Sequence, residues 1–147
     1  MRKVLPPTYF LAAILLAAVL HFVLPVREVV GSFWRLLGMV PLAVGIFLNL
    51  AADRAFKKYG TTVKPFEESN VLVTEGVFRV SRHPMYLGMV LILLGAAVLL
   101  GSVTPFAVVA VLAVVFDRVF IAPEERMLEE AFAERFREYR KRVRRWI

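Results

Sequence analysis

The sequence contains no cysteine, and its two histidines, His21 and His83, lie far apart. Without thiols the chain can form no disulfide and no thiolate metal site, and it has no cysteine nucleophile. Two distant histidines also argue against a metal centre, so we expect no bound metal. These absences exclude the thiol-dependent enzyme classes.

Charge is sparse relative to the apolar content. Apolar residues make up 59% of the 147 residues and charged residues 21%, and the mean hydropathy is +0.68. A soluble domain is usually nearer half apolar, and this length suits a single domain, 1–147. In lipid, the backbone N–H and C=O groups must form their hydrogen bonds within their own segment. We therefore expect an all-α integral membrane protein.

Four apolar stretches are long enough, or nearly so, to cross a bilayer, which takes about 20 helical residues. They cover residues 9–26, 33–52, 84–100 and 105–122. The first lacks a small-residue cleavage site, so we expect it to be retained as a helix and not removed as a signal peptide. The short links after the first and third stretches predict four transmembrane helices in two antiparallel hairpins.

The basic residues fall almost entirely on one side of this topology. Of the 19 lysines and arginines, all but Arg27 and Arg35 precede the first span, lie between the second and third, or follow the third. Basic loops stay in the cytoplasm. We therefore expect a protein of the cell inner or plasma membrane, with both termini, a cap loop at 59–83 and the active site cytoplasmic. This placement explains the net charge of +7 without a nucleic-acid partner.

The tail, residues 123–147, predicts a cytoplasmic amphipathic helix that starts where Pro123 ends the fourth span. Its early residues are acidic and its late residues basic, which matches the helix dipole. We expect its basic, distal half to lie on anionic lipid. We expect the stretch from Leu128 to Tyr139 to fold back as a lid. Six apolar residues recur at helical spacing on one face: Leu128, Phe132, Phe136, Tyr139, Val143 and Trp146.

The segment SRHPMYLG, residues 81–88, places an arginine and a histidine at the mouth of the third span. Pro84 suits the first helical position and keeps His83 extended before it. The free N–H groups of the helix start, together with Arg82, form an anion site. Tyr86 and Gly88 follow, and glycine lets another group approach closely. The plainer alternative is a positively charged flank of a membrane helix.

Three carboxylates lie near the same inner face. Glu124 and Glu125 could simply offset the helix dipole, or they could bind a cation such as an ammonium or sulfonium. We expect Asp117, inside the fourth span, to pair internally with Arg82 or Arg54. An anion site and a cation site on one face would together suit a zwitterionic amino-acid head.

Two segments in this order, RHPMYLG (82–88) and EERMLEEAFAERFREYRKRV (124–143), resemble the isoprenylcysteine carboxyl methyltransferase and phospholipid methyltransferase superfamily of integral-membrane enzymes. The resemblance covers about residues 60–147. It implies binding of S-adenosylmethionine at the cytoplasmic face and methylation of a lipophilic small molecule or membrane lipid. It also implies the residues of the cofactor pocket: His83, Tyr86, Gly88 and Glu125, with Glu124 beside it.

Methyl transfer from a sulfonium is an in-line displacement, so the protein mainly orients the reactants and excludes water. We expect Arg82 and His83 to bind the cofactor carboxylate and Glu125 its ammonium. A carboxylate or thiol acceptor needs no strong base, whereas an amine must lose a proton to Glu125, His83 or Asp117. The catalytic group stays open among Arg82, Glu125 and Asp117. A nicotinamide-dependent membrane reductase and a non-enzymatic membrane scaffold are the alternatives.

Overall fold

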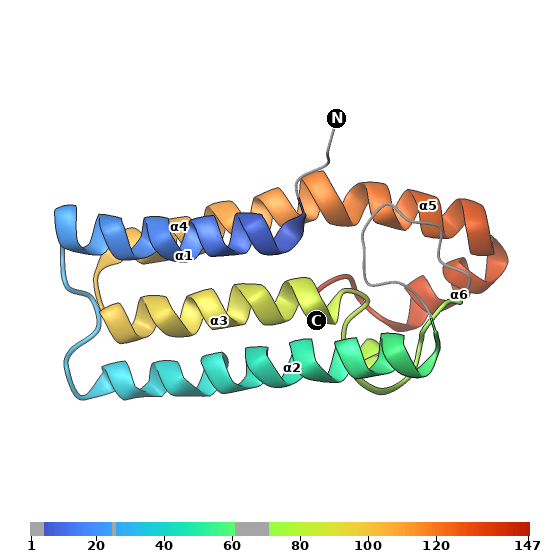
Figure 1. Ribbon diagram of the computed structural model, residues 1–147, viewed down its shortest axis with the longest axis horizontal. Coiled ribbons are helices and arrows are strands. Elements are labelled where there is room, and N and C mark those ends of the chain that lie inside the picture. Colours follow the sequence, from blue (N-terminus) through green and yellow to red (C-terminus); the bar gives the residue numbers. More distant parts are fainter. Residues whose placement is uncertain (1–4, 25, 61–70) are drawn as a thin grey trace.

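The structure, a computed structural model, describes residues 5–24, 26–60 and 71–147. Arg2, Lys3 and Lys64, which contribute to the predicted topology, lie outside the described residues, as does most of the first half of the 59–83 loop. Within the described part every regular element is helical, as expected (Figure 1). The main helices are α1 (Pro6–Val23), α2 (Met39–Lys58), α3 (Pro84–Leu100), α4 (Val103–Val115), α5 (Ala122–Phe132) and α6 (Glu134–Arg142).

Three helical stretches of the described chain are long and apolar enough to cross a membrane: Pro6–Val23, Trp34–Lys58 and Val103–Phe132. The second begins with the 3₁₀ turn Trp34–Gly38, and it runs six residues past its predicted end. There, beyond the apolar part, Lys57 Nζ lies 2.6 Å from Asp53 Oδ2 across one turn. α3 is equally apolar but has 17 residues, and its bounds are those predicted.

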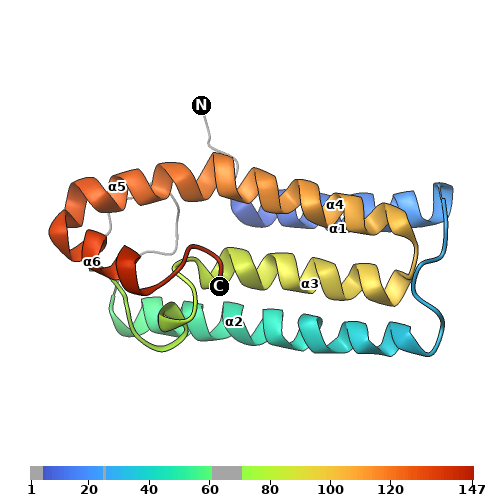
Figure 2. The same cartoon turned by 180° about the vertical axis from the view of Figure 1, so that it is seen from behind.

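α3 is the central helix of the bundle. In both views α2 lies on one side of α3, and α1 and α4 lie on the other (Figures 1 and 2). The expected α3–α4 hairpin is confirmed, but the expectation that α1 and α2 pack as a pair is wrong, because α1 packs against α4 and α3. The link after α1 crosses the α3–α4 turn, where the Val29 and Val30 N–H groups donate to the Gly101 carbonyl at 2.8 and 3.1 Å.

Glycines allow α2 and α3 to approach closely. Gly45 of α2 faces Gly88 of α3, and Gly38, just before α2, faces Gly95 of α3. A Cβ built on Gly38 would lie 2.5 Å from the Gly95 carbonyl oxygen, and one on Gly45 would overlap the Gly88 carbonyl oxygen. Small residues of this kind let helix backbones pack tightly where lipid surrounds them. This contact fixes α3, and therefore the residues at its amino-terminal end.

The fourth span does not end before Pro123, contrary to the sequence-based expectation. α4 continues through the π-helical segment Phe116–Ile121 directly into α5. In a regular α-helix a proline ring clashes with the carbonyl four residues earlier. The wider π turn just before Pro123 relieves that crowding, and the proline occupies the first turn of α5. The two glutamates that follow are thus carried on a continuation of α4.

The tail forms two helices, although a single one was expected. Ala133, at a φ of 43°, separates α5 from α6, and α6 turns back toward α2 (Figure 1). Part of the predicted apolar face packs on the protein. Its cluster contains Ala52, Val73, Phe78, Phe136, Tyr139 and Val143. The Tyr139 hydroxyl also donates to the Phe78 carbonyl at 2.6 Å, which ties α6 to the segment before α3.

Candidate functional site

Helix α3 begins at Pro84, as predicted. His83 precedes it with a backbone that is non-helical, as expected, but not fully extended (φ −129°, ψ 61°). Ser81 is fully buried, and its Oγ accepts the His83 N–H at 3.1 Å. The same hydroxyl donates to the Arg145 carbonyl at 3.1 Å. These bonds fix the direction in which Arg82 and His83 leave the backbone.

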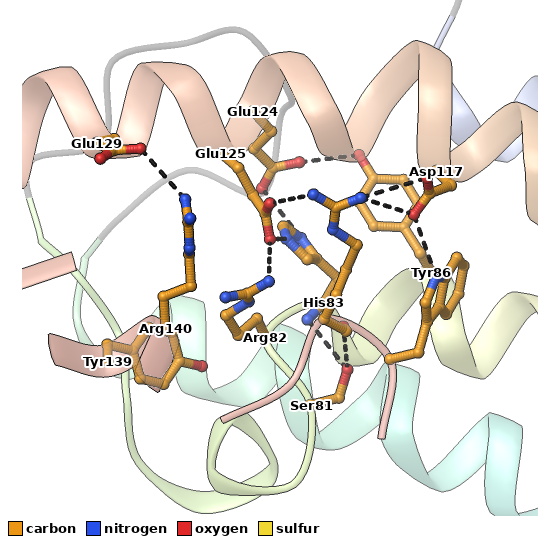
Figure 3. Close-up of polar contacts among 12 residues, drawn as sticks. Ser81, Arg82, His83, Tyr86, Asp117, Glu124, Glu125, Glu129, Tyr139 and Arg140 are labelled. Atoms are coloured by element: carbon orange, nitrogen blue, oxygen red, sulfur yellow. Dashed lines mark hydrogen bonds and ion pairs between the residues drawn. The ribbon is translucent and has the colours of Figure 1, made fainter. Parts of the chain in front are cut away.

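Glu125 of α5 is the centre of the site, where it meets three cationic or basic side chains (Figure 3). Its Oε1 lies 2.8 Å from an Arg82 nitrogen and 3.3 Å from His83 Nε2. Its Oε2 accepts a hydrogen bond from Arg145 at 2.6 Å. The Glu125 side chain is only 7% exposed. The structure therefore brings together the anion-binding and cation-binding residues that the sequence predicts on one face.

The charge of Glu125 is stabilised in place. Burial alone disfavours a charged carboxylate. Arg82, His83 and Arg145 all contact this carboxylate, and cationic partners of this kind offset the cost of burying the charge.

Arg82 is buried and incompletely hydrogen-bonded. Its side chain is 8% exposed, and burial lowers the pKa of its guanidinium despite the charge of Glu125. Its Nε is the one buried side-chain nitrogen or oxygen without a hydrogen-bond partner among the described residues. An unpaired buried donor is costly. The structure thus leaves one donor of Arg82 without a partner in the described part of the protein.

Tyr86 and Glu124 form a second pair beside the first. The Tyr86 hydroxyl donates to Glu124 Oε2 at 3.1 Å, and His83 Nδ1 lies 3.9 Å from Glu124 Oε1. The Tyr86 ring packs against Phe116 and Phe120 of the π segment, with centroids 5.2 and 6.2 Å away. The two glutamates thus diverge, since Glu125 meets the arginines while Glu124 meets the tyrosine.

A cavity of about 200 Å³ opens beside this pair. Its lining combines a few polar side chains with apolar residues from or next to α1, α2 and α3. Such a lining can admit the polar head of a ligand together with part of an apolar chain. The polar lining is Arg82, His83, Tyr86 and Glu124, and the apolar lining includes Leu5, Pro7, Phe56, Phe78, Met85 and Met89.

Two site residues differ from expectation. Asp117 pairs with Arg145, at 3.1 and 3.3 Å, and with the Trp146 indole N–H at 3.3 Å, so the predicted partners Arg82 and Arg54 are wrong. The reason is that the segment after α6 returns to the π segment. Gly88 faces α2, where a Cβ would overlap the Asn49 amide, and it does not line the cavity. Its role here is helix packing.

Sequence reasoning missed Ser81, Arg145 and Trp146 as site residues. Arg145 is one of a run of basic residues near the end of the sequence, and local pattern does not distinguish it from Arg144. Arg145 reaches Glu125 only because the segment after α6 folds back past Ser81. Among the described residues, no group of three histidine, cysteine or acidic side chains is arranged to hold a metal ion.

Comparisons with known proteins agree with this architecture. A phospholipid methyltransferase family model matches residues 33–135. Protein-S-isoprenylcysteine O-methyltransferase A of Arabidopsis thaliana is 35% identical over 111 residues, which cover 72% of this chain and 55% of that protein. Its B counterpart is 40% identical over 80 residues, which cover 52% of this chain and 39% of that protein. The chain thus spans about half or less of the length of these relatives.

A solved structure supports the fold over nearly the whole chain. The eukaryotic intramembrane Ras methyltransferase, an isoprenylcysteine carboxyl methyltransferase, aligns with a TM-score of 0.67 at 21% identity. The alignment covers 96% of this chain and 51% of that one, which indicates a shared helical fold. The family match extends over more than two thirds of the sequence and includes both RHPMYLG and the paired glutamates. The chain belongs to the phospholipid methyltransferase family, within the superfamily that also contains the isoprenylcysteine carboxyl methyltransferases.

Proposed function

We propose that the protein transfers a methyl group from S-adenosylmethionine to a lipophilic acceptor at the cytoplasmic face of the membrane. The observation that carries the proposal is the buried meeting of Arg82 and His83 with Glu125, beside a largely apolar cavity. Family membership supports the reaction class. The named activities of the relatives belong to longer proteins, so the activity of this chain is our inference.

The residues present fit the amino-acid head of the cofactor. A carboxylate can accept from the unpaired Arg82 Nε, near the amino-terminal end of α3. An ammonium can bind the Glu125 carboxylate, whose two oxygens already contact cationic side chains. In the structure these two side chains lie 2.8 Å apart, so one zwitterion can reach both, with its carboxylate on Arg82 and its ammonium on Glu125. Such charge-assisted hydrogen bonds are strong where water is excluded.

When bound, S-adenosylmethionine would supply an electrophilic methyl group on a sulfonium, with its thioether as the leaving group. The protein's part is to fix the head group, align the acceptor and exclude water. The apolar cavity lining at Phe56, Met85 and Met89 suits an acceptor that arrives from lipid. We assign no general base, because a carboxylate or thiolate acceptor would need none.

We also infer the predicted topology, with four spans and the site on the cytoplasmic side. The site lies at the end of the bundle that carries Lys57, Lys58 and Arg79. Because the native chain has no cysteine, single-cysteine labelling tests this orientation cleanly. Val80 and Val29 are both exposed. We expect Val80→Cys to be labelled by an impermeant maleimide only in opened vesicles and Val29→Cys in intact cells; the reverse pattern would contradict the orientation.

Cofactor identity can be tested by titration of the detergent-purified chain. We expect S-adenosylhomocysteine, the demethylated product, to bind with a measurable heat, and NADPH to give none. His83→Ala should weaken the binding, because His83 is hydrogen-bonded to Glu125 and lines the cavity. Binding of NADPH instead would favour a membrane reductase. An absence of both would favour a scaffold without enzymatic activity.

A further inference from the structure

The segment after α6, residues 143–146, contacts the candidate site and is held by hydrogen bonds on both sides of Arg145. The backbone N–H of Arg82 donates to the Arg144 carbonyl at 3.1 Å, and the Ser81 hydroxyl donates to the Arg145 carbonyl at 3.1 Å. The Trp146 indole then donates to Asp117 at 3.3 Å. The backbone of this segment is therefore fixed independently of the Arg145 side chain.

The Arg145 side chain bridges two carboxylates. One terminal nitrogen donates to Glu125 Oε2 at 2.6 Å, and the other lies 3.1 Å from Asp117 Oδ1. Arg145 is 35% exposed, whereas Arg82, on the other Glu125 oxygen, is 8% exposed. Glu125 is thus held by a buried cation, Arg82, on one oxygen and by a more accessible cation, Arg145, on the other.

We propose that Arg145 is an exchangeable cation that occupies the ammonium position on Glu125 and so sets the affinity of the site for zwitterionic ligands. The proposal rests on the proposed function. A ligand ammonium and the Arg145 guanidinium compete for the same Glu125 oxygen. Displacement leaves Arg145 paired with Asp117, so its charge is never left alone. Arg82 cannot exchange in this way, since Glu125 is its one carboxylate partner among the described residues.

A purely structural role for Arg145 predicts the opposite sign. If the side chain only clips the tail to α5, its loss should loosen the site and weaken ligand binding. If it competes with the ligand, its loss should strengthen binding, although two ion pairs have been removed. The direction of the change in affinity therefore separates the two roles.

The test is calorimetric titration of S-adenosylhomocysteine into the detergent-purified full chain. We expect Arg145→Gln to bind about tenfold more tightly than the native protein, the scale of one charge-assisted hydrogen bond. Arg144→Gln is the matched control. It removes the same charge from the neighbouring residue, whose side chain is exposed. We expect its affinity to be unchanged.

Arg145→Lys keeps the charge if the glutamine variant does not fold. A lysine ammonium cannot span both carboxylates as the guanidinium fork does, so we expect a gain of about threefold. Unchanged or weaker binding in the folded Arg145 variants, with the native protein binding, overturns the Arg145 proposal alone. If the native protein and every folded variant fail to bind, the proposed function fails, and the role of Arg145 fails with it.

Discussion

Replacing Glu125 by glutamine is expected to abolish binding of S-adenosylhomocysteine, with an affinity loss of at least about a hundredfold. The amide keeps the shape of the side chain but removes the charge that an ammonium requires. It also leaves the buried Arg82 facing a neutral group, and an unpaired buried charge costs about 3–5 kcal/mol. We therefore expect a lower unfolding temperature as well. Calorimetric titration and thermal unfolding in detergent measure the two effects.

Glu130→Gln is the control for this experiment, because Glu130 lies on the same helix but is exposed. It removes the same charge, so any general electrostatic effect on the basic tail would appear in both variants. We expect native affinity for Glu130→Gln. If the folded Glu125→Gln protein binds as tightly as the native chain, Glu125 does not hold the ligand and the proposed site is wrong.

Gly45→Val is expected to cause the largest loss of folded protein. A Cβ at Gly45 would overlap the Gly88 carbonyl oxygen and lie 2.8 Å from Ile92 Cγ1 and 2.9 Å from the Ile92 backbone nitrogen. The Ile92 side chain could rotate away, but the two backbone atoms cannot. α2 and α3 would have to separate, at a cost of about 3 kcal/mol or more.

The yield of monodisperse protein in size-exclusion chromatography, followed by thermal unfolding, measures this loss. Gly31→Val is the matched control, since the nearest atom to a Cβ there is Trp34 Cδ1 at 3.9 Å. We expect near-native yield for the control and little folded protein for Gly45→Val. Comparable stability of the two variants would show that the α2–α3 contact is looser than described.

The start of α3 could be predicted because its determinants are local. Proline fixes its own backbone and that of the residue before it, so Pro84 and His83 could be placed from the sequence. The same rule failed at Pro123, because a π turn further back along the helix accommodates the ring. That turn has no recognised sequence signal here, and it carries Glu124 and Glu125 onto a continuous helix.

The partners of the charged residues could not be predicted from spacing. The sequence indicates that Asp117 needs an internal cation, and this is correct. Which cation it meets depends on the break at Ala133, where the tail reverses, and on the return of the chain past Ser81. Gly88 shows the same limit, because close approach to its backbone is real, but the approaching group is α2.

The most direct test of the account is methyl transfer itself. The detergent-purified protein would be incubated with S-adenosylmethionine labelled in its methyl group and a lipid extract, and label would be counted in the organic phase. We expect label with the native chain, loss of that label with Glu125→Gln, and retention with Glu130→Gln. Folded native protein that transfers no label to any lipid fraction, or equal transfer by Glu125→Gln, would contradict it.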